Sequence, residues 1–194
     1  MGYTTAGSLA AYLGIQSAGE LPLLGDAIDR ATSAINNATN RSFESVPGTL
    51  YYHNQTARLR GQVLYLETYL QSVTGIVNGN GATITPVAGN PSSGWFLEPM
   101  NYGPPYTMIR LGFNNPWVFN VDGRITVSGT LGYSATAPDD IVQATLRLAS
   151  YFYRIKDSQI FDTTADAATG GMTINKGIPA DVQKILNRYP KPPI

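Results

Sequence analysis

The sequence predicts an α+β fold, in which a small helical bundle carries a β-rich module inserted between its second and third helices. Two observations lead to this prediction. Apolar residues recur at helical spacing near both ends of the chain, whereas the middle holds short runs rich in β-branched and aromatic residues, separated by turn formers. We assign residues 1–44 and 134–194 to the helical core and residues 45–133 to the inserted module.

The first helix is predicted to follow Thr4 and Thr5, whose hydroxyl groups can cap a helix start. Gly14 ends this helix, because glycine readily adopts the left-handed conformation just past a helix. Its apolar residues are Leu9, Ala10, Tyr12 and Leu13.

The second helix is predicted to begin at Pro22, because proline is tolerated in a first helical turn. Asp26 and Asp29 near its start and Arg41 at its end suit the helix dipole. The residues that step by three and four, and therefore face inward, are Leu24, Ile28, Ala31, Ile35 and Ala38.

The middle of the chain changes to short strand-like runs. Asn78-Gly79-Asn80-Gly81 predicts a hairpin between two of them. Gly94–Pro105, rich in glycine, proline and aromatic residues, is predicted to be a long loop. The predicted strands are Thr49–His53, Val63–Glu67, Ser72–Val77, Ala82–Thr85, Thr107–Leu111 and Arg124–Thr130.

Two further helices are predicted near the end of the chain. Asp139 and Asp140 suit the first turn of the third helix, and Asp157–Gly177 follows it as a polar loop. Pro179 opens the fourth helix, which ends by Tyr189. The third helix carries Ile141, Thr145, Leu148, Phe152 and Ile155 at helical spacing, and the fourth points inward with Val182, Ile185 and Leu186.

Charged residues make up only 13% of the chain, about half of the usual share of roughly 25%. The 13 basic and 13 acidic residues cancel, which argues against a general nucleic-acid binder because such a protein needs a basic face. The absence of cysteine excludes a disulfide scaffold, thiolate zinc sites and a cysteine nucleophile. No apolar run predicts a membrane span, and residues 1–15 lack the charged start of a signal peptide.

The sequence contains little that predicts catalysis. His53 is the single histidine, and no nucleophile-elbow motif accompanies it. The acidic residues Asp162 and Asp166 lack the ligand spacing of a calcium loop. We therefore predict no catalytic residue, no metal site, no cofactor and no enzymatic activity.

An alternative function uses the aromatic residues of the middle zone. Aromatic side chains with paired carboxylates can line a sugar cleft, and the middle zone offers the carboxylates Glu67 and Glu98. The aromatic residues near them in the sequence are Tyr65, Tyr69, Trp95 and Trp117. This alternative is a carbohydrate-binding or glycoside-hydrolysing protein that uses the aromatic β module. The 12 tyrosines of the chain fit either a tyrosine-rich β module or a protein interface.

Several junctions resemble those of the head–tail connector (adaptor) proteins of long-tailed bacteriophages, which are small helical ring proteins under the portal. The matching stretches cover the two helical zones, about half of the chain, and the long β module departs from the compact members of the family. They are Tyr3-Thr4-Thr5 with Leu9-Ala10-Ala11-Tyr12-Leu13-Gly14-Ile15, Leu24–Ala38 with Asn40-Arg41-Ser42-Phe43, Gly132-Tyr133 with Pro138–Ala144, and Ile178-Pro179-Ala180-Asp181-Val182 with Leu186 and Tyr189.

The resemblance implies a structural virion protein that assembles in the host cytoplasm. Its copies would form a dodecameric ring between the phage portal protein and a stopper or tail-completion protein. DNA would pass through the lumen without sequence-specific binding, and no membrane would be involved.

The same resemblance implies where the portal is contacted. It points to the last helix and the proline-rich tail, namely Ile178, Val182, Ile185, Leu186, Tyr189, Pro190, Lys191, Pro192, Pro193 and Ile194. The long loop before that helix is expected to become ordered within a ring, with Asp162, Thr163, Thr164, Gly170 and Gly171 as its candidate assembly residues.

Overall fold

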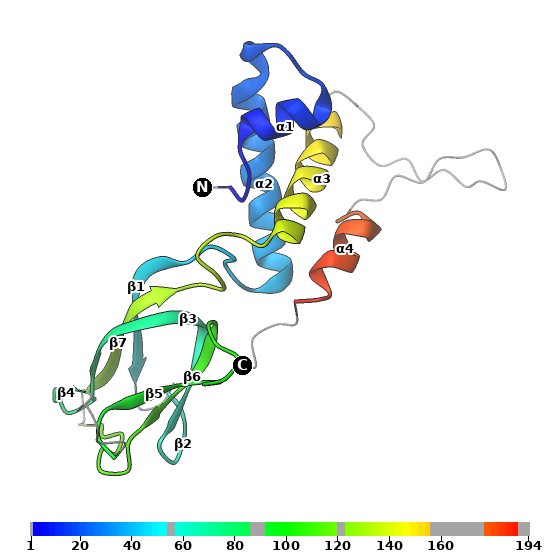
Figure 1. Cartoon of the computed structure of the whole chain (residues 1–194). Coiled ribbons are helices and arrows are strands. Elements are labelled where there is room, and N and C mark those ends of the chain that lie inside the picture. The colour runs from blue at the N-terminus through cyan, green and yellow to red at the C-terminus, as the bar shows by residue number, and fades with distance from the viewer. Residues whose placement is uncertain (1, 54–56, 86–91, 120–122, 156–176, 190–194) are drawn as a thin grey trace. The chain divides into compact units, whose positions relative to one another are not determined.

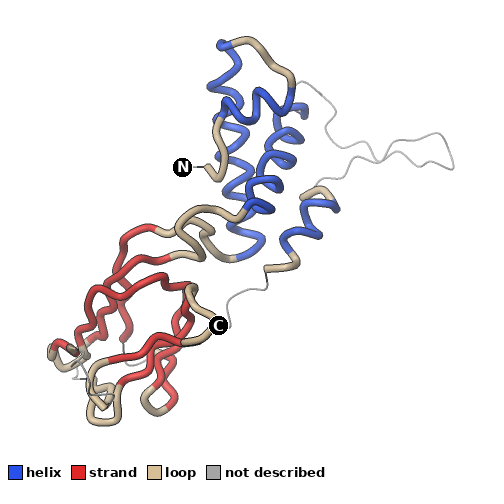
Figure 2. Tube along the Cα trace, viewed as in Figure 1, coloured by secondary structure: helices blue, strands red, loops and turns tan. Residues whose placement is uncertain are grey.

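The computed structural model describes residues 2–53, 57–85, 92–119, 123–155 and 177–189 (Figure 1). These residues form two compact units. The helical unit takes its described residues from Met1–Asn40 and Ala137–Pro190, and the β unit takes them from Arg41–Thr136. Figure 2 shows the separation of helix and strand between the two units, which confirms the α+β class.

Helix α1 spans Ala6–Leu13 and has both of its predicted ends. The backbone N–H of Ser8 donates to the hydroxyl of Thr5 at 3.1 Å, which caps the first turn. Gly14 adopts φ 72°, a left-handed conformation, and its N–H bonds to the carbonyls of the last turn.

Helix α2 spans Leu21–Thr39 and follows a short 3-10 turn, η1, at Ala18–Glu20. The earlier start places Asp26 and Asp29 beyond the first turn, so their predicted interaction with the helix dipole is wrong. The inward stripe is confirmed for Leu24, Ile28, Ala31 and Ile35.

The stripe of α2 differs from the prediction at its last turn. Ala38 is exposed, and Thr39 is buried in its place. The hydroxyl of Thr39 donates to the carbonyl oxygen of Ile35 at 2.8 Å, which satisfies the buried polar group. Asn40 then ends the helix with φ 52°, so Arg41 belongs to the β unit and not to the helix end.

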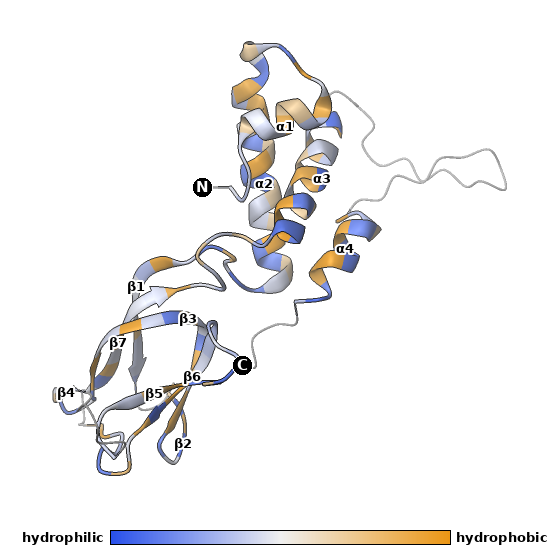
Figure 3. Ribbon diagram, viewed as in Figure 1, coloured by the Kyte–Doolittle hydropathy of each residue, from blue (hydrophilic) through white to orange (hydrophobic). Residues whose placement is uncertain are grey.

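Helices α3, Asp139–Ile155, and α4, Ala180–Leu186, complete the helical unit. Helix α3 packs against α1, α2 and α4, and the colours of Figure 3 alternate along α2 and α3 as expected of amphipathic helices. Asp139 and Asp140 occupy the first turn of α3, as predicted. The buried residues of α3 are Ile141, Ala144, Thr145, Leu148, Ala149 and Ser150.

The β unit is one antiparallel sheet in the order β1-β7-β3-β6-β5, with β2 and β4 also paired to β3. The longest strand, β3, therefore has four partners. The strands are β1 Val46–His53, β2 Arg58–Arg60, β3 Val63–Val77, β4 Thr83–Ile84, β5 Trp95–Glu98, β6 Tyr106–Leu111 and β7 Arg124–Leu131.

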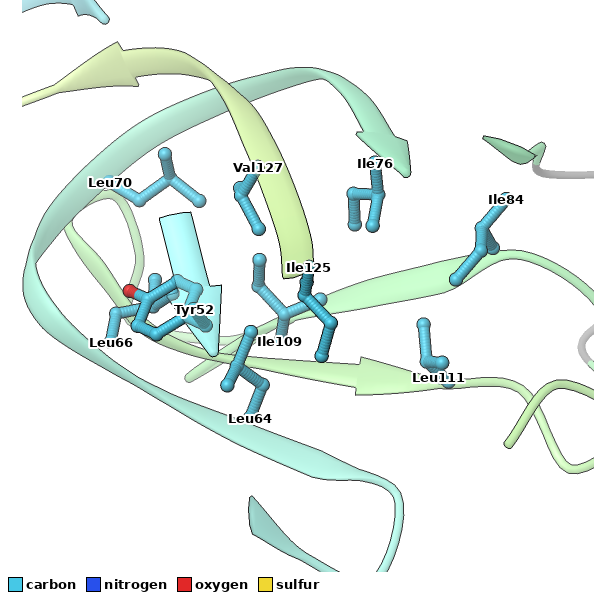
Figure 4. Close-up of a cluster of buried hydrophobic side chains, with 10 residues drawn as sticks. All are labelled: Tyr52, Leu64, Leu66, Leu70, Ile76, Ile84, Ile109, Leu111, Ile125 and Val127. Carbon is cyan, nitrogen blue, oxygen red and sulfur yellow. The ribbon is translucent and has the colours of Figure 1, made fainter. Parts of the chain in front are cut away.

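Strand β3 curves around a hydrophobic core (Figure 4). Its first part pairs with β6 and its second part with β7, and the register shifts between Leu70 and Ser72 and again between Val73 and Gly75. Such shifts bend a strand and increase its twist. The buried cluster inside the curve is Tyr52, Leu64, Leu66, Leu70, Ile76, Ile84, Ile109, Leu111, Ile125 and Val127.

The strands correct the sequence prediction in three places. The two predicted runs Val63–Glu67 and Ser72–Val77 are parts of one strand, β3. The predicted loop Gly94–Pro105 contains strand β5, and β2 was not predicted at all. The hairpin at residues 78–81 is confirmed, since the N–H of Asn78 donates to the carbonyl of Ala82 at 2.8 Å between β3 and β4.

The first and last segments of the β unit are bonded to each other. The N–H of Tyr133 donates to the carbonyl of Ser42 at 3.1 Å, and the N–H of Ser45 donates to the carbonyl of Ser134 at 2.9 Å. Gly132 lies in this contact at φ 134°, and a Cβ added to it would meet the Cα of Ser45 at 2.5 Å. Glycine is therefore required for the two segments to approach so closely.

Arg41 is buried beside these two segments. Its guanidinium group lies over the rings of Tyr69, Phe43 and Tyr133, with distances of 4.7, 5.6 and 5.6 Å to the ring centres. The Tyr133 ring also meets the other two rings edge to face. We call these four residues the Arg41 cluster; it joins both ends of the β unit to strand β3 by cation–π contact.

Candidate assembly surfaces

The residues predicted to contact a portal divide into three groups in the structure. Val182 and Leu186 are buried within the helical unit, where α4 packs against α3 and α2. In this structure they hold α4 against α3 and α2, and their contact with a portal stays a prediction. Ile178, Ile185 and Tyr189 are half-buried, and their portal contact stays a prediction.

The remaining predicted interface residues lie outside the described residues. They are Pro190, Lys191, Pro192, Pro193 and Ile194 of the tail. The same holds for the candidate assembly-loop residues Asp162, Thr163, Thr164, Gly170 and Gly171.

Two polar contacts fix α4 along α3. Asp181 at the start of α4 forms an ion pair with Arg147, and the hydroxyl of Tyr189 donates to Oδ1 of Asp140 at 2.6 Å. Partial desolvation raises the pKa of Asp181, but hydrogen bonds from Arg147 and from the Val182 backbone outweigh it, and the pKa is lowered. Helix α4 therefore runs antiparallel to α3, with its start beside Arg147 and its end beside Asp140.

Large apolar side chains are exposed at one end of the helical unit. The hydroxyl of Tyr153 donates to Oε2 of Glu20 at 2.7 Å, which places the end of α3 beside the start of α2. The exposed side chains at this end are Leu21, Leu23, Ile155 and Tyr12. Exposed apolar groups that gather in one place are typical of a protein–protein contact.

A groove of about 500 Å³ opens beside this apolar end. It lies among α1, α3 and the start of α4, which Figure 1 labels. Two tyrosines, an isoleucine and a proline give it apolar walls, and two arginines and an aspartate lie along them. The lining residues are Tyr12, Arg147, Ser150, Tyr151, Arg154, Ile155, Pro179 and Asp181.

The β unit has an exposed apolar region of its own, at the β5–β6 hairpin. Tyr102 in the turn is 86% exposed, and Met100 and Phe113 flank a groove of about 290 Å³. An ion pair between Arg110 and Glu98 crosses this groove from β6 to β5. The remaining lining residues are Gln62, Phe96, Leu111 and Gly112.

The two carboxylates of the alternative function do not share this groove. Glu98 lines it and is paired with Arg110, whereas Glu67 is an exposed residue of β3 outside the groove lining. His53 is the exposed last residue of β1, opposite Arg124 of β7. Among the described residues, Glu67 and His53 therefore do not join Glu98 in the groove of the β5–β6 hairpin.

Two other kinds of site were sought over the described ranges. No helix in those ranges has the length and apolar character needed to cross a membrane. Nor do the side chains placed there include three or more histidine, aspartate or glutamate residues grouped so that they could hold a metal ion.

The chain matches no known family model and no curated protein. It does match solved structures. One is described as the neck of an empty gene transfer agent particle computed with C6 symmetry, with 22% identity, a TM-score of 0.65, and coverage of 99% of this chain and 91% of that chain. Another, from the virion of a native gene transfer agent particle, has 20% identity, a TM-score of 0.61 and the same coverage. At these identities the likeness shows that the chain shares the fold of a protein in such a neck.

Proposed function

We propose that the chain is a structural subunit of the neck of a tailed bacteriophage or phage-like particle. In this proposal its copies form a ring between the portal and a stopper or tail protein, and DNA passes through the centre. The ring is part of the virion, and the subunit performs no catalysis.

The observation that carries the proposal is the extent of the structural likeness. The match with the neck chain includes 99% of this chain, so it extends over the helical unit and the β unit together. A shared fold alone does not determine function. The helix junctions of the sequence also resemble those of phage adaptor proteins, and this independent resemblance supports the same proposal.

A ring subunit needs contact surfaces on more than one side. The exposed apolar end of the helical unit and the β5–β6 hairpin supply one candidate surface on each unit. The low charge content suits such surfaces, because an unpaired buried charge is costly. The neck with the related chain was computed with C6 symmetry, and a ring of twelve copies is compatible with sixfold symmetry.

The test is ring formation with the portal protein of the same particle. We expect annular particles in negative-stain micrographs of the mixture, with density added to one end of the portal. Absence of any complex with that portal, by microscopy and by co-sedimentation, would overturn the proposal.

Surface variants make the test specific. Leu23→Asp on α2 and Tyr102→Asp in the β5–β6 hairpin should reduce ring formation, because each buries a charge in a contact. Asn37→Asp on α2 and Thr74→Asp on β3 change exposed polar residues and serve as controls. Equal ring formation by all four variants would show that neither apolar surface takes part.

A further inference from the structure

The groove beside α1 has walls that suit a proline-rich segment. Tyr12 from α1 is 54% exposed, and Tyr151 and Ile155 from α3 and Pro179 before α4 complete the apolar lining. Aromatic-lined grooves bind proline-rich chains because the extended polyproline helix is preformed and loses little entropy on binding. A segment of this kind is therefore the ligand class that the groove favours.

The chain itself contains such a segment. Residues 190–194 read Pro-Lys-Pro-Pro-Ile, in which three of the five residues are proline. Lys191 adds one positive charge to it, whereas the groove lining carries two arginines and one aspartate, so the fit rests on the apolar and aromatic walls and not on charge.

A five-residue segment that follows Tyr189 is too short to line the groove of its own copy. Tyr189, the residue before the tail, is bonded to Asp140 at the start of α3, whereas Tyr151 comes eleven residues later on that helix. Eleven residues of helix span about 16 Å. A five-residue polyproline segment spans about 15 Å, so its whole length would only bridge the distance to Tyr151 and none of it would line the groove. Because α4 runs from Arg147 towards Asp140, Tyr189 also lies at the end of α4 that is away from the groove.

We propose that the groove formed by Tyr12, Tyr151, Ile155 and Pro179 binds residues 190–194 of a second copy of this chain. Each copy then offers a groove at one end of α3 and a tail from the other end, which makes the contact head-to-tail. Contacts of this type close into rings when the rotation between copies allows it. The inference deepens the proposed ring, and it gives the tail a different partner from the portal that the family resemblance implies.

The experiment uses a fluorescein-labelled peptide with the sequence of residues 187–194 and the full-length chain. Fluorescence anisotropy should show saturable binding. Tyr12→Ala should weaken the binding about tenfold, the effect of losing one aromatic anchor. Tyr102→Ala removes a highly exposed tyrosine of the β unit and should leave the affinity unchanged. A peptide in which Pro190, Pro192 and Pro193 are replaced by alanine should bind at least tenfold more weakly.

A second groove variant guards against loss of fold. Ile155→Asp changes the last residue of α3, which is partly exposed, and circular dichroism reports whether either variant keeps its helices. A folded pair of groove variants that bind the peptide as tightly as the original chain would overturn the inference. Absence of saturable binding would also overturn it, as would equal weakening by Tyr12→Ala and Tyr102→Ala.

The same peptide separates this inference from the proposed function. Binding to the isolated portal and not to this chain would overturn the inference and leave the neck proposal standing. Binding to this chain, in a protein that never forms rings with the portal, would support the groove and overturn the neck proposal instead.

Discussion

The guanidinium carbon of Arg41 lies 4.7 Å from the centre of the Tyr69 ring, in a site where Arg41 is only 6% exposed. The arginine precedes the first strand of the β unit, and the tyrosine lies in the middle of β3. Their contact therefore joins the entry of the chain into the β unit to the central strand of its sheet. A desolvated cation over an aromatic ring is worth more than an exposed one.

Arg41→Met should accordingly lower the free energy of unfolding by about 2 kcal/mol, since it removes the charge from a buried aromatic site. Arg124→Met is the matched control. Arg124 lies 4.5 Å over the ring of Tyr51, but both side chains are exposed, so its loss should cost less than about 1 kcal/mol. Urea denaturation monitored by tyrosine and tryptophan fluorescence measures the free energy of unfolding of both variants. An equal loss in the two variants would show that burial does not strengthen the Arg41 contact.

Gly132→Ala should destabilise the protein by more than about 2 kcal/mol. The residue has φ 134°, and the added methyl group would lie 2.6 Å from the carbonyl oxygen of Glu44. Gly75→Ala provides the comparison, because the Cβ at that strand position meets nothing within 4 Å and should change stability by less than about 1 kcal/mol. Thermal denaturation should give a lower melting temperature for Gly132→Ala than for Gly75→Ala. Equal melting temperatures would contradict the close approach of Gly132 to the backbone of Glu44 and Ser45.

Tyr52 should make the protein sensitive to high pH. Burial in the β core raises the pKa of its phenol from 10.0 to about 12. As the pH rises, Tyr52 therefore loses its phenol proton in the unfolded chain before it does so in the folded protein. Its contribution to the free energy of unfolding is fully present below pH 10 and is lost between pH 10 and pH 12, which lowers the stability by up to about 3 kcal/mol. Tyr52→Phe should remove this loss, whereas Tyr102→Phe at an exposed position should retain it. Unfolding curves at pH 9 and pH 11 provide the measurement.

The ion pair between Arg147 and Asp181 should act at the other end of the pH range. Because the pKa of Asp181 is lowered, the stabilisation is present above about pH 4 and is lost as the pH falls through the folded-state pKa. Both side chains are substantially exposed, so the contribution is below about 1 kcal/mol. Carboxyl chemical shifts followed by NMR should show the Asp181 pKa rising in Arg147→Gln, and an unchanged pKa would contradict the pairing.

The helices could be predicted from the sequence because their signals are local. The hydroxyl of Thr5, the glycine at position 14 and the paired aspartates at 139 and 140 each act within one turn of their own helix. The failure at Ala38 and Thr39 has a physical reason. A threonine can be buried when its hydroxyl bonds back to the preceding turn, and a pattern of apolar residues alone does not register this.

The sheet was harder to predict because its strands depend on distant partners. Strand β5 lies between Gly94 and Pro99, which are turn signals in the sequence. It is a strand because its backbone pairs with that of β6, and a local pattern does not show this pairing. The single strand β3 looked like two because its register shifts interrupt the alternation of buried and exposed residues. The Arg41 cluster likewise unites positions 41, 69 and 133, and no spacing in the sequence reveals that contact.

The candidate interface on α4 shows a different limit. Val182 and Leu186 have the spacing of an inward-facing helix stripe, and the structure buries them as that spacing predicts. Spacing of this kind predicts burial within the bundle and carries no information about a partner protein, so the portal contact of these two residues stays a prediction. The grooves, by contrast, combine residues such as Tyr12, Tyr151 and Pro179 from separate elements, so they are visible only once the fold is known.

The four partners of β3 set the order in which the β unit can form during synthesis. When β3 leaves the ribosome, only the short strands β2 and β4 are near it in the chain; β6 and β7 end at residues 111 and 131. Until β6 and β7 have been synthesised, most backbone N–H and C=O groups of β3 have no strand partner. Strand β1 also has no partner until β7 has been synthesised. Long-range pairing of this kind slows folding and leaves strand edges open to other chains. A nascent copy is thus most vulnerable to aggregation just before β7 emerges.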